Sequence, residues 1–303
     1  MSFTSFSEII TLAKEMETKR IVIAKAEDNH VLDAVKLILD EGLNLAFTLV
    51  GDKAAMNTIA KDLSLPLEDM KLIHAASDLE ASRIAVKEVA SGEGDFLMKG
   101  LVSTRILLKE VLKEEHGLRT GRIMSHLASF EMPHYDRILF MTDGGINPTP
   151  NLEEKQQIID NAVRFISALG ISDPKVAVLA AVETVNPKME ATLDGAVLSK
   201  MQDRGQIKGG IVEGPLALDN AVSKEAAAQK GISGPVAGKA DILLVPDIES
   251  GNLLGKSITF LGGGTMAGVV VGAAVPVVLT SRADSKRSKM VSMALAALSA
   301  GTS

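Results

Sequence analysis

The sequence predicts an α/β fold of two domains with mostly parallel sheets. Short apolar runs alternate with amphipathic segments of helical periodicity along almost the whole chain. Most runs are continuous stretches of Val, Ile, Leu and Ala, a pattern typical of strands buried on both faces of a parallel sheet. The length of 303 residues fits two domains of ordinary size. These features predict sheets covered by helices on both faces.

The predicted strands are spread along most of the chain, with amphipathic segments between them. They cover Arg20–Ala26, Ala46–Gly51, Lys71–His74, Asp95–Lys99, Arg137–Asp143, Lys175–Val182, Gly209–Glu213, Asp241–Pro246, Val269–Gly272 and Val275–Thr280.

Two of the predicted helices have recognisable ends. In Asp28–Glu41 the first residue is a good N-cap, and Gly42 is placed to end the helix. In Asn151–Leu169 the first residue and Glu154 have the spacing of a capping box, and Gly170 follows the last turn. Further helices are expected over Asp219–Gly231, Asn252–Phe260 and roughly Ser285–Ala300.

Composition excludes several classes of function. The chain has 32 Lys and Arg against 38 Asp and Glu, a net charge of −6, and only 3% aromatic residues, which disfavours nucleic-acid binding. The absence of Cys excludes disulfides, thiolate metal sites and a Cys nucleophile, and the His residues show no metal-ligand spacing. The longest apolar tract, Met266–Thr280, is too short for a membrane span, and the N-terminus lacks the basic cluster of a secretory signal. We therefore expect a cytoplasmic protein that binds neither nucleic acid nor membrane.

The break between the two predicted domains is expected at residues 143–150. This segment, Asp-Gly-Gly-Ile-Asn-Pro-Thr-Pro, interrupts the strand and helix pattern with two glycines and two prolines.

Two glycine-rich segments imitate nucleotide-binding motifs. Gly251–Ser257 has three residues between its glycines where a P-loop needs four. Gly262–Ala267 resembles a dinucleotide fingerprint, but it follows a predicted helix and precedes a strand, so we predict a helix stop and turn. Ser250, Gly251 and Asn252 are still candidate ligand-binding residues, because they follow a strand at the start of a helix, where amides can bind an anion. A capped helix start without a ligand is the alternative.

The segment after the last predicted strand carries side chains suited to an oxyanion or a phosphate. Thr280 and Ser281 can donate hydroxyl hydrogen bonds, and the guanidinium of Arg282 can hold a phosphate through two parallel hydrogen bonds. Asp284 follows directly. The alternative is a helix N-cap, in which Ser281 or Asp284 caps the final helix and Arg282 is solvated.

A similar arrangement occurs in the first half of the chain. The strand Asp95–Lys99 ends in Lys99 and Gly100, and Ser103 and Thr104 follow near a helix start. Lys99 is a candidate phosphate-binding cation, or else it lies along the sheet edge with its charge in solvent.

Several segments, spread over nearly the whole chain, form a combined signature. They are Leu97–Gly100, Ala181–Met189, Gly214–Ala221, Ala240–Pro246 and Thr280–Ser285. In this order they resemble the phosphate acetyl/butyryltransferase family, and most closely its phosphate butyryltransferase branch. The resemblance implies an isocitrate/isopropylmalate-dehydrogenase-like fold, with a cleft between two α/β domains. The first domain would comprise residues 1–143 and 281–303, and the second residues 144–280. The resemblance also implies a homodimer or higher homo-oligomer.

The resemblance implies reversible transfer of a short-chain acyl group, in which acyl-CoA and inorganic phosphate give acyl phosphate and CoA. In the acetyl branch, a Ser-Arg pair at the positions of Ser281 and Arg282 is assigned to the acyl carbonyl and the phosphate. Coenzyme A thioester and phosphate are then substrates, and no cofactor is needed. Because the chain has no Cys, an acyl-cysteine intermediate is ruled out, which favours a ternary complex.

The chain departs from the acetyl branch at one position. That branch has an Asp seven residues after the Ser, as the base for the CoA thiol proton, and here the position is Ser288. Asp284 is the nearest substitute. Two alternatives stay open. One is a non-catalytic CoA-binding module. The other is a metal- and NAD-dependent decarboxylating dehydrogenase of the same fold, although its candidate carboxylates lack convincing ligand spacing: Asp219, Asp241 and Asp247.

Overall fold

The computed structural model describes residues 2–281 and 284–301. The chain forms two compact units. The terminal unit comprises Phe6–Arg122 and Ala267–Ser303, and the middle unit comprises Met1–Ser5 and Ile123–Met266. The domain boundaries expected from the sequence stay a prediction. The Gly- and Pro-rich segment 143–150 lies inside the middle unit, where it connects a strand to a helix.

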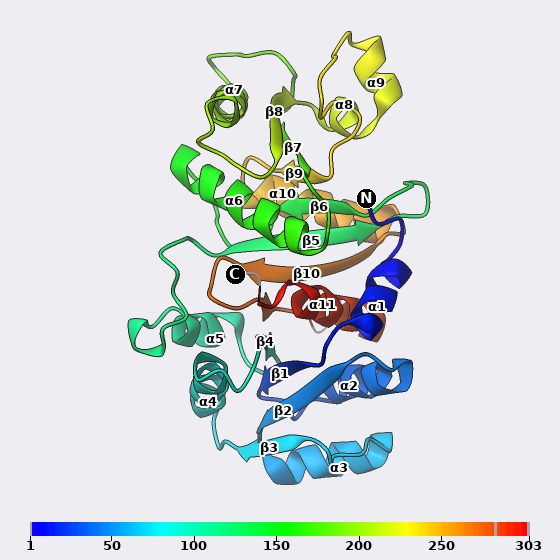
Figure 1. Ribbon diagram of the computed structural model, residues 1–303, viewed down its shortest axis with the longest axis vertical. Helices are drawn as coiled ribbons and strands as arrows, with labels where there is room; N and C mark the ends of the chain where they lie inside the picture. Colours follow the sequence, from blue (N-terminus) through cyan, green and yellow to red (C-terminus); the bar gives the residue numbers. More distant parts are fainter. Residues whose placement is uncertain (1, 282–283, 302–303) are drawn as a thin grey trace. The chain divides into compact units, whose positions relative to one another are not determined.

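The strands of the terminal unit run in the order β3-β2-β1-β4-β11-β10. Figure 1 labels all of them except β11. Neighbours pair in parallel from β3 to β11, and β10 is antiparallel to β11. The bounds are β1 (Lys19–Ala24), β2 (Leu45–Gly51), β3 (Lys71–His74), β4 (Phe96–Lys99), β10 (Thr265–Val271) and β11 (Val277–Val278).

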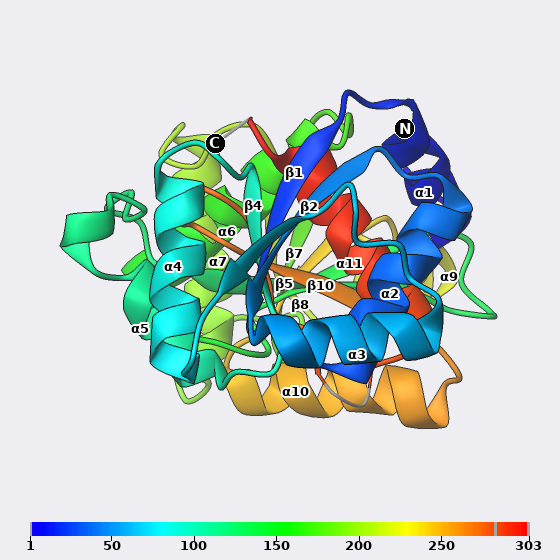
Figure 2. The same ribbon diagram turned by 90° about the horizontal axis from the view of Figure 1, so that it is seen from below.

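The direction in which strands are added reverses at β1. The chain steps outward from β1 to β2 and β3, and then returns to add β4 on the other side of β1. Right-handed connections therefore place α2 (Asn29–Glu41) and α3 (Lys53–Leu63) on one face, and α4 (Asp78–Ala90) on the other. Figure 2 shows this separation, with α5 (Thr104–Val111) beside α4. In sheets of this kind, ligands bind at the carboxyl ends of the strands where the order reverses.

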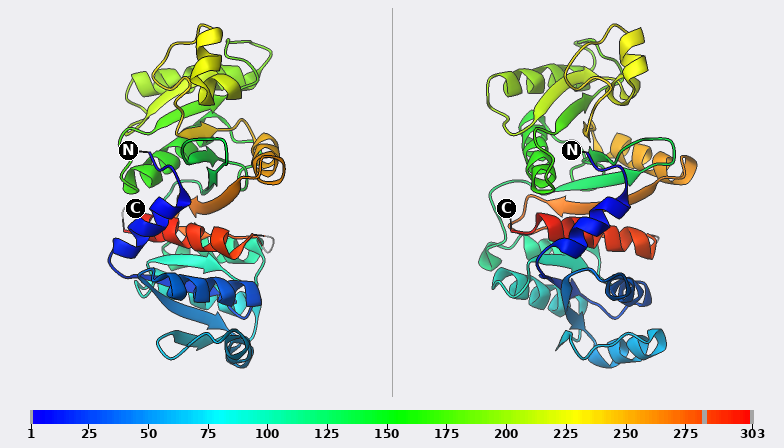
Figure 3. Two further views of the ribbon diagram at one scale, coloured as in Figure 1. Left: turned by 90° about the vertical axis from the view of Figure 1, so that its right-hand side faces the viewer. Right: turned by 45° about the vertical axis from the view of Figure 1, so that its right-hand side comes forward.

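The last helix completes the terminal unit. α11 (Lys286–Ser299) packs against α2 and against α1 (Phe6–Glu15), and Figure 3 shows α1 and α11 side by side. Every residue of α11 from Ser288 to Ala297 is buried, polar ones included, while Lys286 and Arg287 at its start are exposed. Its first turn follows β11, and this brings Thr280, Ser281 and Lys289 to the carboxyl end of the parallel strands.

The middle unit is also an α/β layer structure, with strand order β5-β6-β9-β7-β8. Only β5 and β6 are antiparallel. Figure 3 shows α6 and α7 on one side of these strands and α9 and α10 on the other. The bounds are β5 (Ser125–Glu131), β6 (Leu139–Thr142), α6 (Leu152–Ala168), β7 (Lys175–Leu179), α7 (Glu190–Asp203), β8 (Ile211–Leu216), α8 (Leu218–Val222), α9 (Lys224–Gln229), β9 (Ile242–Leu244) and α10 (Ile248–Lys256).

The predicted α/β class with mostly parallel strands is confirmed, and so are several helix ends. The Asp28 carboxylate accepts a hydrogen bond from the amide of Val31, and Gly42 ends α2 with a φ of 72°. Asn151 and Glu154 form the predicted capping box of α6. The glycines at 262–264 end a helical segment, Ser257–Leu261, before β10, as predicted.

One strand was not predicted, and two predicted helices have the wrong bounds. β5 was not predicted, because its sequence Ser-His-Leu-Ala-Ser-Phe-Glu is not a continuous apolar run; Ser125 and Ser129 are nevertheless buried. The helix expected over Asp219–Gly231 is divided at Ser223, which ends α8 and caps α9. The helix expected from Asn252 begins earlier, at Ile248, where Asp247 caps it.

The last strand and helix also differ from expectation. The strand expected over Val275–Thr280 is only the two residues of β11. The cap of the final helix is Ser285, not Ser281 or Asp284, because the Ser285 hydroxyl accepts from the amide of Ser288. Among the described residues, no helix combines the length and the apolarity needed to cross a membrane.

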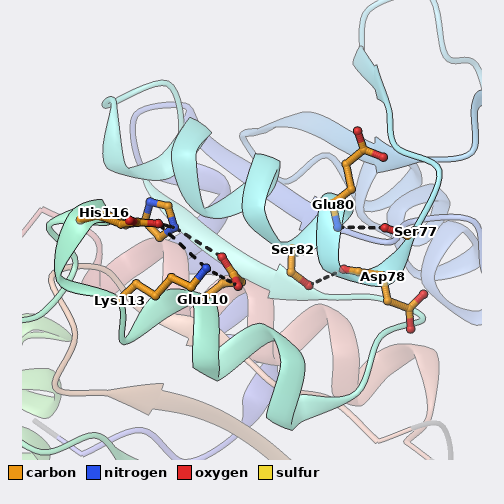
Figure 4. Close-up of polar contacts among 8 residues, drawn as sticks. Ser77, Asp78, Glu80, Ser82, Glu110, Lys113 and His116 are labelled. Carbon is orange, nitrogen blue, oxygen red and sulfur yellow. Dashed lines mark hydrogen bonds and ion pairs between the residues drawn. The ribbon is translucent and has the colours of Figure 1, made fainter.

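A buried ion cluster stabilises the end of α5 (Figure 4). The Glu110 side chain is 1% exposed, and its oxygens contact Lys113 Nζ at 2.8 Å and His116 Nε2 at 3.4 Å. Burial raises the pKa of Glu110, but the hydrogen bonds from Lys113 and His116 outweigh it and hold the pKa below the usual value. A carboxyl of this kind contributes stability above its unfolded pKa, about 4.3, and loses that contribution as the pH falls through its folded pKa.

Replacing Glu110 with Gln should therefore lower the free energy of unfolding by about 2 kcal/mol at neutral pH. It should also reduce the loss of stability below about pH 4.3, because the titrating group is gone. Urea unfolding measured between pH 3 and 7 checks both expectations. Glu115→Gln is the matched control, since the Glu115 side chain is 69% exposed and should change stability by no more than about 0.5 kcal/mol. Equal effects of the two substitutions would contradict the assigned role of Glu110.

Candidate active site

A pocket lies at the carboxyl ends of β1, β4 and β11, at the reversal point of the strand order. Its wall includes Asp28 and His30 after β1, Lys99 and Gly100 at the end of β4, and Thr280 and Ser281 after β11. Lys289 of α11 also lines it. The pocket therefore brings together four of the candidates named from the sequence, which come from two distant segments of the chain.

Gly100 joins the ends of β4 and β1. Its amide donates to the carbonyl of Ala24, and the next amide donates to the carbonyl of Lys25. A Cβ on residue 100 would lie 2.2 Å from the Lys25 oxygen and 2.8 Å from the Ala24 oxygen. Only glycine fits this approach without moving the backbone, so Gly100 shapes the pocket by holding two strand-end loops together.

We expect Gly100→Ala to lower the free energy of unfolding by about 3 kcal/mol, because the methyl group would displace rigid backbone atoms at the pocket. Gly255→Ala is the control, since its Cβ would meet only the side chains of Met141 and Phe130, at 3.4 Å, inside α10. That change should be neutral or stabilising, by up to about 1 kcal/mol. Urea unfolding of the two variants tests this pair of expectations. If Gly100→Ala is as stable as the wild type, the close approach is not a constraint.

Lys99 lies at the pocket with its side chain partly buried. Its ammonium donates to the carbonyls of Gly100 and Val102, both at 3.3 Å. These contacts fold the side chain over its own loop, so the positive charge stays at the carboxyl end of β4.

Ser281 and Asp284 form a closed turn. The amide of Ser281 donates to Asp284 Oδ2 at 2.6 Å, and the amide of Asp284 donates back to the carbonyl of Ser281 at 3.2 Å. Thr280, just before the turn, is buried. Arg282, the remaining candidate of this segment, lies outside the described residues.

Ser103 and Thr104 begin α5. Ser103 is its N-cap, with a hydroxyl that accepts from the amide of Ile106 at 3.3 Å. Thr104 is exposed at the first helical position. Neither is among the described residues that line the pocket.

Ser250, Gly251 and Asn252 lie in the middle unit, in the first turns of α10. The Ser250 amide and hydroxyl both donate to the Asp247 carboxylate, at 2.8 and 2.7 Å. The pKa of Asp247 is below its usual value, chiefly because of the Ser250 amide, and the charge of Lys155 adds to the effect. Gly251 packs against Gly144, where a Cβ on either would lie 3.0 Å or less from the other's backbone. This turn is thus a tightly capped helix start.

Lys289 is the pocket residue that sequence reasoning missed most clearly. It is 2% exposed, and its ammonium donates to the carbonyl of Asp284. Burial lowers the pKa of Lys289, and the charges of Asp284 and Asp28 only partly oppose this. Nothing in the Lys286–Lys289 segment distinguishes Lys289 from its charged neighbours, because only the packing of α11 buries it. Asp28 and His30 were missed as well, since Asp28 was interpreted only as a helix cap.

A metal site would need several His, Asp or Glu side chains that converge on one point. Among the residues that the structure describes, no three His, Asp or Glu side chains converge as a metal site would require. The Asp219 carboxylate pairs with Lys230 Nζ at 3.0 Å, and Asp241 lies 3.9 Å from Arg137. These carboxylates therefore serve as ion-pair and hydrogen-bond partners.

Comparison with known proteins identifies the family. The model of the phosphate acetyl/butaryl transferase family matches residues 5–83 and 78–297. A phosphate butyryltransferase of Clostridium acetobutylicum is 50% identical over 297 residues, which cover 98% of each chain. A phosphate acetyltransferase of Thermotoga maritima is 46% identical, over 92% of this chain and 95% of the relative.

A solved structure agrees with these relatives. The branched-chain phosphotransacylase of Enterococcus faecalis V583 matches with a TM-score of 0.84 and 36% identity, over 93% of this chain and 99% of the other. This structural match and the sequence matches cover nearly the whole length of both proteins in each pair. The chain belongs to the phosphate acetyl/butaryl transferase family and is an acyltransferase.

Proposed function

We propose that this acyltransferase moves a short-chain acyl group, butyryl first, between coenzyme A and inorganic phosphate. The observation that carries the proposal is the 50% identity to a phosphate butyryltransferase over nearly the full length of both chains. The pocket supports it with the groups that such chemistry needs. Lys99 supplies positive charge, and Thr280 and Ser281 supply hydroxyls beside it.

In the proposed reaction, an oxygen of phosphate attacks the thioester carbonyl carbon. The tetrahedral intermediate collapses as the C–S bond breaks, and the proton of the phosphate is transferred to the departing CoA thiolate. Arg282 and Lys99 hold the phosphate, and the Ser281 hydroxyl donates to the oxyanion. The thiolate is a good leaving group, with a pKa of about 8.5 if it resembles a Cys thiol, so it needs only modest acid help.

Asp284 is the proposed base, which takes the proton of the CoA thiol when the reaction runs from acyl phosphate to acyl-CoA. Its carboxylate belongs to the same turn as Ser281, with Oδ2 2.6 Å from the Ser281 amide. Ser288 lies 3.0 Å from the hydroxyl of Ser285 at the cap of α11, and a hydroxyl is a poor base at neutral pH. Asp284 is therefore the more suitable of the two positions.

The wider proposal follows the family. The reaction proceeds through a ternary complex with no resident cofactor, and Ser103, Thr104 and the α10 start at Ser250, Gly251 and Asn252 contribute to substrate binding. The fold is of the isocitrate/isopropylmalate-dehydrogenase type, and the chain works as a cytoplasmic homodimer or higher homo-oligomer.

The test is a thiol-release assay with acetyl-, propionyl-, butyryl- and a branched acyl-CoA, each with and without phosphate. We expect release of CoA that depends on phosphate and is fastest for butyryl-CoA. Fastest release from another acyl-CoA would correct the acyl group. CoA binding without turnover of any thioester would instead select a non-catalytic CoA-binding module, and loss of rate with a chelator would favour a metal-dependent enzyme.

A further inference from the structure

The position of Lys289 requires a physical explanation. It lies in the first turns of α11, where it reaches the pocket from a helix otherwise buried against α1 and α2. Lys286, three residues earlier, points elsewhere and pairs with Asp33 at 3.5 Å, with more than half of its side chain exposed. One helix start therefore carries an ordinary surface lysine and a buried one.

The buried ammonium of Lys289 is only partly compensated. Its hydrogen-bond partner among the described residues is the neutral carbonyl of Asp284, and no described carboxylate forms an ion pair with it. A buried ammonium without a carboxylate partner is costly, and a group of this kind in the wall of a pocket is a candidate for a functional site. The burial of Lys289 at a pocket wall thus indicates an anion as the ligand.

The other charged groups at the pocket narrow the choice of anion. Lys99 of β4 adds a second ammonium, and Thr280 and Ser281 add hydroxyls. The Asp28 carboxylate of α2 is held at 3.0 Å by the amide of Val31, and that of Asp284 by the amide of Ser281. His30 of α2 is a further titratable side chain in the wall. Two ammonium groups with nearby hydroxyls match a dianion, for which phosphate oxygens are suitable acceptors.

We propose that Lys289 is a phosphate-binding residue of this pocket, which acts with Lys99 on the phosphate that attacks the thioester. The proposal rests on the proposed function, and it adds to it a residue from the last helix. Coenzyme A carries phosphate groups of the same chemistry. The reacting phosphate is the source to which the proposal commits, because Lys289 and Ser281 share one small pocket and Ser281 is the oxyanion donor.

The test compares Lys289→Met, Lys289→Arg and the control Lys286→Met. Met keeps the length of the buried chain and removes its charge, whereas Arg keeps the charge. We expect Lys289→Met to raise the KM for phosphate at least tenfold, to leave the KM for butyryl-CoA within about twofold, and to be partly rescued in Lys289→Arg. Lys286→Met should leave both constants unchanged. Unchanged phosphate KM in Lys289→Met would overturn the proposal, as would a rise confined to butyryl-CoA, which would assign Lys289 to the phosphates of CoA.

Calorimetric titration with inorganic phosphate separates this proposal from the proposed function. A wild-type protein that binds phosphate more tightly than Lys289→Met, yet releases no thiol, would support the phosphate site while refuting the reaction. If Lys289→Met does not fold, the pH dependence of phosphate affinity in the wild type and in Lys289→Arg tests the proposal instead. Phosphate affinity of the wild type should fall at a lower pH than that of Lys289→Arg, since burial disfavours the lysine charge and arginine does not titrate. Coincident pH profiles would overturn the proposal.

Discussion

Replacing Ser281 with Ala should lower kcat for CoA release by about 10²–10³-fold, the usual effect of removing one oxyanion donor. The Ser281 amide is held by Asp284, so the backbone turn has support that does not depend on the hydroxyl. The fold should therefore survive the substitution, and the lost activity should come from the missing donor. Steady-state kinetics with butyryl-CoA and phosphate measure the effect.

Two further variants show whether the loss is specific. Ser77→Ala removes the hydroxyl that caps α4 by accepting from the Glu80 amide (Figure 4), so it should cost about 1 kcal/mol of stability and leave kcat unchanged. Arg282→Gln should raise the KM for phosphate as well as lower kcat, because the guanidinium is assigned to the phosphate. A Ser281→Ala protein with wild-type kcat would remove the hydroxyl from the reaction.

Lys155→Met is expected to produce the largest loss of stability, about 3–5 kcal/mol. Lys155 of α6 forms an ion pair with Asp194 of α7, and the two side chains are only 7% and 13% exposed. Removing the ammonium would leave a buried carboxylate without its partner. The charge of Lys155 also helps to lower the pKa of Asp247, the cap of α10, so the change should weaken that helix start too.

The double variant Lys155→Met with Asp194→Leu should recover most of the lost stability, because an apolar pair often replaces a buried ion pair without loss. Urea unfolding of the two single variants and the double variant gives the coupling energy directly. A single Lys155→Met variant within about 1 kcal/mol of the wild type would show that the carboxylate is solvated, contrary to its low exposure.

Features of the sequence that act locally were predicted well. Continuous apolar runs found nearly all the parallel strands, because a strand buried on both faces needs apolar side chains throughout. Asp28 and the Asn151–Glu154 pair were recognised because a cap depends on a few neighbouring residues. Lys99 and Ser281 could be chosen because Lys99 ends one strand and Ser281 follows another, and parallel strands bring their carboxyl ends together.

Features that depend on packing were missed. β5 mixes polar and apolar residues without a regular period, and it pairs antiparallel with β6, so no apolar run marks it. Lys289 looks like one more charge in the Lys286–Lys289 segment until the packing of α11 buries it. The glycine at position 100 was named as a ligand residue, whereas its contacts with Ala24 and Lys25 also give it a structural role that only the strand order reveals.

The most direct test of the proposed active site is a crystal structure of the protein with inorganic phosphate and either butyryl-CoA or an unreactive thioether analogue of butyryl-CoA. We expect a phosphate at the carboxyl ends of β1, β4 and β11, within hydrogen-bond distance of Lys99 and Lys289, with the thioester carbonyl next to the Ser281 hydroxyl. A phosphate and an acyl group bound together elsewhere, with this pocket filled only by water, would contradict this expectation.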